Sequence, residues 1–143
     1  MGESPSRGQK DAGSRRGGGP DTNRVLVVAP SPIDRIVIAR TIQRIYLKPV
    51  SAAPEEALHV LIADPPVLVV VDRAIKDELL NPLMDELSRR RRISEGSLPR
   101  ILMIETARER AHTPPFAGVV DMTISKPILQ ETLQRAVERL IGG

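Results

Sequence analysis

Three residues with charged or hydroxyl side chains stand just after strand-like runs of this sequence. Asp72 directly follows five consecutive apolar residues, and Thr106 and Lys126 each come two residues after another strand-like run, at 101–104 and 119–124. Side chains that follow parallel strands gather at one edge of a sheet, where ligand sites form in open α/β folds. A carboxylate and an ammonium at that edge can pair and neutralise each other. Two simpler interpretations stay open, namely a carboxylate that caps a loop and a Lys-Pro turn at the surface.

The sequence lacks the residue sets that common catalytic and metal sites need. There is no cysteine, and His59 and His112 are the only imidazoles, so thiolate sites are excluded. The segment 29–32, after the first strand-like run, contains two prolines and so lacks the amides that would cradle a phosphate. No nucleophile, base and orienting residue stand at a recognisable spacing. We therefore expect that the protein is not an enzyme.

The elements that must position these residues alternate along the chain. Short β-branched runs are typical of parallel strands that are buried on both faces. Helical patterns between them predict a doubly wound five-stranded parallel sheet, a flavodoxin-like three-layer α/β/α sandwich. The expected strands are residues 24–28, 48–51, 67–71, 101–104 and 119–124. The expected helices cover 32 to about 47, 54 to about 65, 79–87 and 128–141, with one or two turns between 106 and 118.

Two of these helices carry side chains whose direction can be predicted. Ser31 and Pro32 are typical of an N-cap and a first helical residue. The helix after them is expected to turn its apolar side chains toward the sheet, and these are Ile33, Ile36, Val37, Ile42 and Ile45. The four arginines at 89–92 are expected to form a solvated helix end, favourably placed on the helix dipole.

Composition favours one domain with a tail. The chain has 143 residues, of which 41% are hydrophobic, and this is enough for one compact core. Residues 1–23 are mostly Gly, Ser, Arg and Pro and predict a disordered N-terminal tail, so the domain is expected over 24–141. No apolar stretch is long enough to span a membrane, which predicts a cytoplasmic protein without membrane contact.

Three stretches stand in an order that matches a known family. They are the segment 25–35 after the first strand, the segment 66–72 at the third, and Ser125-Lys126-Pro127 after the fifth. With the helix pattern they cover residues 24–141, and the sequence resembles the receiver (CheY-like) family of response regulators in two-component signalling.

The resemblance implies a role for each residue at the sheet edge. Asp72 occupies the phosphoacceptor position, and Lys126 matches the lysine that contacts the acceptor or its phosphate. The bond before Pro127 is expected to be cis. Thr106 matches the hydroxyl that binds the phosphate, and Glu105 competes for that place if the register slips by one residue.

The sequence departs from the family at the metal pocket. Family members that use magnesium carry an acidic pair after the first strand, and this chain has Ala29 and Pro30 there. Because Mg²⁺ prefers carboxylate oxygens, we expect a degenerate pocket with no metal and no other cofactor, and we do not expect magnesium-dependent phosphorylation. Asp34 and Asp77 fall inside the first helix and beyond the third strand's loop, so they do not replace the pair. Thr123 stands where the family often keeps a switching aromatic residue.

These observations predict a stand-alone atypical receiver that acts by binding proteins. The expected partners are a histidine kinase, a phosphotransfer protein or an effector, and a phosphorylation-independent adaptor is favoured. Only Gly142 and Gly143 follow the last helix, so no output domain is expected. One alternative is a small α/β enzyme or nucleotide binder that uses the same crevice. Another is a basic nucleic-acid accessory protein, although scattered arginines, a net charge of +3 and only two aromatic residues argue against nucleic acid.

Overall fold

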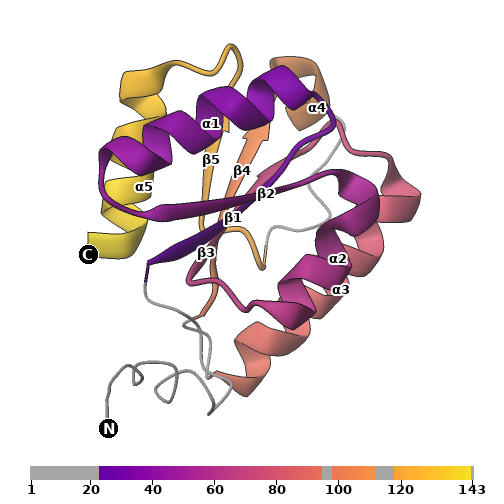
Figure 1. Ribbon diagram of the computed structural model, residues 1–143. Coiled ribbons are helices and arrows are strands. Elements are labelled where there is room, and N and C mark those ends of the chain that lie inside the picture. The colour runs from indigo at the N-terminus through magenta and orange to yellow at the C-terminus, as the bar shows by residue number, and fades with distance from the viewer. Residues whose placement is uncertain (1–22, 95–97, 112–117, 143) are drawn as a thin grey trace, which may run out of the picture.

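The sheet has the order expected for a flavodoxin-like fold. A computed structural model describes residues 23–94, 98–111 and 118–142, so the expected tail lies outside the described residues except for Asn23. Five parallel strands pair in the order β2-β1-β3-β4-β5, with helices on both faces (Figure 1). The predicted fold class is confirmed.

Strands and helices alternate without exception over the described part of the chain. The strands are β1 (Arg24–Val28), β2 (Lys48–Ala52), β3 (Leu68–Asp72), β4 (Arg100–Glu105) and β5 (Met122–Ser125). The helices are α1 (Pro32–Arg44), α2 (Pro54–Ala63), α3 (Asp77–Ile93), α4 (Ala107–Ala111) and α5 (Gln130–Gly142). In its described residues, the segment between β4 and β5 holds one short helix, in line with the one or two turns expected there.

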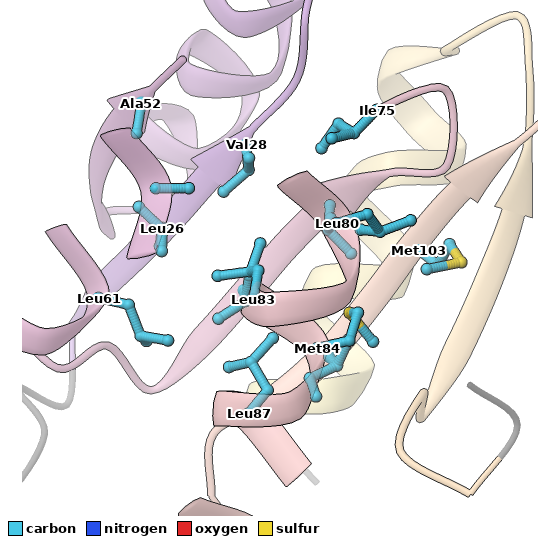
Figure 2. Close-up of a cluster of buried hydrophobic side chains, with 14 residues drawn as sticks. Leu26, Val28, Ala52, Leu61, Ile75, Leu80, Leu83, Met84, Leu87 and Met103 are labelled. Carbon is cyan, nitrogen blue, oxygen red and sulfur yellow. The ribbon is translucent and has the colours of Figure 1, made fainter. Parts of the chain in front are cut away.

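Alternation along the strands divides the core into two layers. Leu26 and Val28 point toward α2 and α3, together with Val69 and Val71 of the neighbouring strand; Figure 2 shows part of this layer, between the sheet and Leu80, Leu83, Met84 and Leu87 of α3. Val25, Val27 and the alternate residues of β3 and β4 form the other layer under α1 and α5. Burial on both faces explains why the central strands are continuously apolar.

The predicted inner face of α1 is wrong in part. The buried residues of α1 are Ile38, Thr41 and Ile42, whereas Ile33 and Ile36 are exposed, as is Val37. The helix carries apolar residues around most of its circumference, so periodicity alone could not select the face. Thr41 can be buried because its hydroxyl donates to the carbonyl of Val37 at 3.2 Å.

The solvated helix end predicted at 89–92 is also wrong for one arginine. Arg91 donates from Nη1 and Nη2 to the two carboxylate oxygens of Asp121 at 2.9 and 3.1 Å, and from Nη1 to the carbonyl of Val119 at 2.9 Å. The two side chains are only 16% and 15% exposed. Arg91 therefore ties the end of α3 to the chain that enters β5.

The same carboxylate explains why β5 begins later than predicted. Asp121 accepts the amide of Ile101 at 2.7 Å through its side chain and donates its own amide to the Ile101 carbonyl at 2.9 Å. The ladder between β4 and β5 starts only at Met122. Val119 and Val120, expected in the strand, instead lie before it and pack partly buried against the layer under α2 and α3.

In the described residues, no helix is long and apolar enough to cross a membrane.

The Asp121 contacts predict a measurable contribution to stability. Asp121→Ala should lower the free energy of unfolding by about 3 kcal/mol, because it removes the carboxylate that the Arg91 guanidinium and the buried Ile101 amide bind. Urea denaturation measures the change. The control is Glu131→Ala, which removes the partner of Arg135 in an exposed pair on α5 and should cost less than about 0.5 kcal/mol. Equal losses in the two variants would contradict this assignment.

Candidate functional site

The carboxyl ends of β1 and β3 meet at the point where the strand order reverses. The chain passes from β1 outward to β2 on one side and then to β3 on the other, and ligands bind at such switch points in doubly wound sheets. Val28 is paired with Val71, so Ala29 comes level with Asp72 across the two neighbouring strands. The topology thus places Ala29 beside Asp72, the candidate acceptor.

Asp72 is held in an ion pair with Lys126. The Lys126 ammonium lies 2.9 Å from Oδ1 of Asp72, and the two side chains are 23% and 1% exposed. The same Oδ1 accepts the amide of Ala74 at 2.8 Å, so Asp72 also caps the loop after β3. The peptide bond between Lys126 and Pro127 is cis. The loop cap that the sequence left open is thus present beside the ion pair, and the role of Asp72 as a phosphoacceptor stays a prediction.

The second carboxylate oxygen of Asp72, Oδ2, differs from Oδ1 in its hydrogen bonding. Oδ2 is buried and has no hydrogen-bond partner among the described residues. Most buried polar atoms in proteins have a partner, and an exception usually marks a place for water, an ion or a ligand group. Within the described part of the chain, the Asp72 carboxylate therefore has one oxygen, Oδ2, that is free to accept a hydrogen bond, while its other oxygen, Oδ1, is already bound.

Magnesium, the metal that the resemblance implies, does not fit the residues around this oxygen. Ala29 and Pro30 offer no side-chain oxygen, and the described residues contain no group of three or more His, Asp or Glu side chains that could hold a metal. The carbonyl of Ala29 accepts Nη1 of Arg35 at 2.5 Å, and the carbonyl of Pro30 lies 3.4 Å from the same nitrogen. A guanidinium beside these carbonyls adds positive charge where a divalent cation would need negative charge.

Thr106 begins α4 through a reciprocal capping contact. Its hydroxyl accepts the amide of Glu109 at 3.1 Å, and the Glu109 carboxylate accepts the amide of Thr106 at 2.9 Å. This is a capping box, and the Thr-x-x-Glu spacing of the sequence could have predicted it. The structure places Thr106 directly after β4, and its contact with a phosphate stays a prediction.

Glu105, the competitor for that position, takes part in a separate network. Its side chain is buried and lies 2.7 Å from Nε of Arg110, whose Nη2 donates to the hydroxyl of Ser125 at 2.9 Å. The carbonyl of Glu105 also accepts the amide of Lys126 at 2.9 Å. Arg110 thus joins α4 to the ends of β4 and β5, next to the lysine that pairs with Asp72. Sequence reasoning missed both Arg35 and Arg110, because neither follows a strand directly.

Comparison with known proteins relates the chain to solved structures. No protein-family model and no curated protein sequence matches it. The REC domain of AraT, a response regulator from Geobacillus stearothermophilus, has a TM-score of 0.68 at 20% identity over 85% of this chain and 95% of that one.

Two further structures agree with this match. A response regulator receiver protein from Burkholderia phymatum has a TM-score of 0.65 at 20% identity over 87% and 96% of the two chains. The Vibrio cholerae chemotaxis protein CheY4 has a TM-score of 0.64 at 22% identity over 82% and 97%. This chain therefore has the fold of receiver domains.

The ion pair predicts non-additive effects of substitution. Lys126→Met should lower the free energy of unfolding by about 3 kcal/mol, because a buried carboxylate loses its counter-charge. Combining it with Asp72→Asn should restore most of that loss, which corresponds to a coupling energy of about 2 kcal/mol in a double-mutant cycle. Urea denaturation of the wild type and the three variants gives the cycle. Additivity within about 0.5 kcal/mol would mean that the pair does not stabilise the fold.

Proposed function

We propose that this receiver-fold chain is an atypical receiver of two-component signalling that works as a phosphorylation-independent adaptor. In this proposal the protein binds a histidine kinase, a phosphotransfer protein or an effector through its surface. The observation that carries the proposal is the ion pair between the buried Asp72 and Lys126, in a pocket without the acidic pair. In this proposal Lys126 supplies the counter-charge of Asp72, so the site needs no dissociable cation.

Phosphoryl transfer to Asp72 would need access of the phosphodonor to the carboxylate and compensation of the negative charge on the transferred group. An attacking carboxylate oxygen must reach the phosphorus in line, and the transferred oxygens must be neutralised, mostly by metal and cationic groups. Asp72 is 1% exposed and one of its oxygens is bound to Lys126 and to Ala74. Lys126 would have to leave Asp72 to meet a phosphate. Without carboxylates for a metal, both requirements are poorly met, and this supports a role that does not depend on phosphorylation.

In this proposal, the side chains of Lys126 and Arg35 supply the positive charge that a bound metal ion would otherwise supply. Lys126 neutralises Asp72, and Arg35 fixes the loop after β1 by donating to the Ala29 and Pro30 carbonyls. A covalently attached cation is always present at full occupancy, unlike a dissociable metal. The carboxyl edge would therefore keep its binding shape at any magnesium concentration.

The face of α1 that sequence reasoning expected inside supports a protein-binding role. Ile33 and Ile36 are 71% and 51% exposed, and Val37 adjoins them on the helix. They lie in the first two turns of α1, which begins close to the carboxyl end of β1. Exposed apolar side chains grouped on one helix face are typical of surfaces that bind a partner's helix. The proposed contact surface is formed by these three residues.

Capture of a partner from the cell of origin tests this proposal. The full chain carries a photo-crosslinking residue at position 40, an exposed arginine on α1. Wild-type and Asp72→Asn baits should crosslink the same partner in similar amounts, because binding does not depend on the carboxylate. Ile36→Glu should reduce the crosslink at least about tenfold, as expected when a charge enters an apolar contact.

Ile62→Glu is the matched control. Ile62 is an exposed isoleucine of α2, on the opposite face of the sheet, and its substitution should leave the crosslink unchanged. A crosslink that disappears in Asp72→Asn would contradict phosphorylation independence. Equal loss in Ile36→Glu and Ile62→Glu would contradict the assignment of the surface to α1.

A further inference from the structure

A cavity of about 300 Å³ opens at the amino edge of the sheet, opposite to Asp72. Pro65 and Pro66 line it from the segment before β3, and Pro99 lines it from the segment before β4. Ile93 and two arginines, Arg89 and Arg90, line it from the last turns of α3. In Figure 1 this is the end of α3 that lies farthest from α4. The proposed adaptor function uses none of these residues.

The apolar wall of this cavity is fixed before any ligand arrives. Pro66 and Pro99 are buried, and each stands directly before a residue that is hydrogen-bonded to the sheet. The amide of Val67 donates to the backbone carbonyl of Arg24 at 3.0 Å, and the amide of Arg100 donates to the carbonyl of Val67 at 2.9 Å. Proline side chains lose almost no rotamer entropy when a ligand packs against them. Ile93 is an exposed isoleucine beside them. A rigid apolar wall of this kind favours an apolar ring or short chain.

The rim of the cavity carries a surplus positive charge. Arg89 donates to both oxygens of Glu86 at 3.0 and 2.6 Å, and Arg90 donates to one of them at 2.8 Å. The hydrogen bond from Arg89 holds the pKa of Glu86 below its usual range, so this carboxylate is ionised at neutral pH. Among the described residues, one carboxylate is thus shared by these two guanidinium groups. The end of the α3 dipole offers about half a negative charge, so the described part of the rim is positive.

We infer that this cavity binds a small carboxylate with an apolar body, such as an arylalkanoate. The apolar body would pack on the prolines and Ile93, and the carboxylate would accept hydrogen bonds from Arg90 and Arg89. Guanidinium groups match a carboxylate in charge and in planar geometry. The volume lies at the low end of small-molecule sites, so the cavity fits a small acid better than a nucleotide.

Titration of the full chain with 4-phenylbutyrate tests the inference. Amide chemical shifts in ¹⁵N-labelled protein should change and saturate with a dissociation constant on the order of 1 mM, as expected for a ligand of this size. The largest changes should fall on Ser94, Leu98 and the last turn of α3. The neutral analogue 4-phenyl-1-butanol should bind at least about tenfold more weakly, because it lacks the charge-assisted hydrogen bonds.

A matched pair of variants separates the cavity from the general positive charge of α3. Arg90→Gln should weaken phenylbutyrate binding at least about tenfold. Arg92→Gln removes the same charge from an exposed arginine that contacts Ser88 instead of the cavity, and its affinity should stay within about twofold of the wild type. Both variants are first compared with the wild type by their amide spectra to establish that they fold.

Three results would overturn the inference. They are shifts that do not saturate, equal binding of the alcohol and the acid, and equal losses in Arg90→Gln and Arg92→Gln. Shift changes centred on Asp72 and Lys126 would also overturn it, because they would place the acid at the carboxyl edge. None of these results bears on the adaptor function, which the crosslinking experiment tests separately.

Discussion

A carboxylate that is 1% exposed needs a counter-charge from inside the protein, and Asp72 obtains it from the ammonium of Lys126 at 2.9 Å. This pair joins the last residue of β3 to the residue that follows β5, and β4 lies between these two strands in the sheet. Its geometry requires β5 to end in register with β4, and that register rests on Asp121 at the other end of the strand. The ion pair at one edge and the Arg91–Asp121 pair at the other thus fix β5 from both sides.

A switch needs two arrangements of similar free energy that a ligand or modification binds differently. Around Lys126, several contacts favour one arrangement: the ion pair with Asp72, the hydrogen bond from the Lys126 amide to the Glu105 carbonyl, and the bridge from Arg110 to Glu105 and Ser125. Arg35 adds a fixed contact at the neighbouring strand end. The proposed adaptor function follows from this concentration of contacts, because a surface held in one state can bind a partner without a preceding signal.

Sequence reasoning predicted the sheet, the carboxyl ends of its strands to about one residue, and the positions of Asp72 and Lys126 just after two of these ends, since buried parallel strands produce continuous apolar runs. It failed where the decisive partner is distant in sequence. The face of α1 could not be chosen because the helix is apolar on several sides, and Arg91 looked solvated because its partner Asp121 lies thirty residues away. Arg35 and Arg110 were missed for a different reason, since each long side chain reaches back from a helix to the end of the preceding strand, which hydrophobic periodicity does not reveal. The capping box of Thr106 and Glu109 was also missed, although it is local and its Thr-x-x-Glu spacing could have predicted it.

Phosphorylation of Asp72 is the most direct test of the account. The full chain, an Asp72→Asn variant and an Ala29→Asp/Pro30→Asp variant are incubated with magnesium and acetyl phosphate, and their intact masses are recorded at once, beside an ordinary receiver that becomes labelled. The account predicts no phosphoryl adduct on the wild type under conditions that label the ordinary receiver. An adduct in the variant with the restored acidic pair would show that the metal ligands are what the wild type lacks. A wild-type adduct that is lost in Asp72→Asn would contradict the account, because it would mean that the buried ion pair opens and that Asp72 works as a phosphoacceptor.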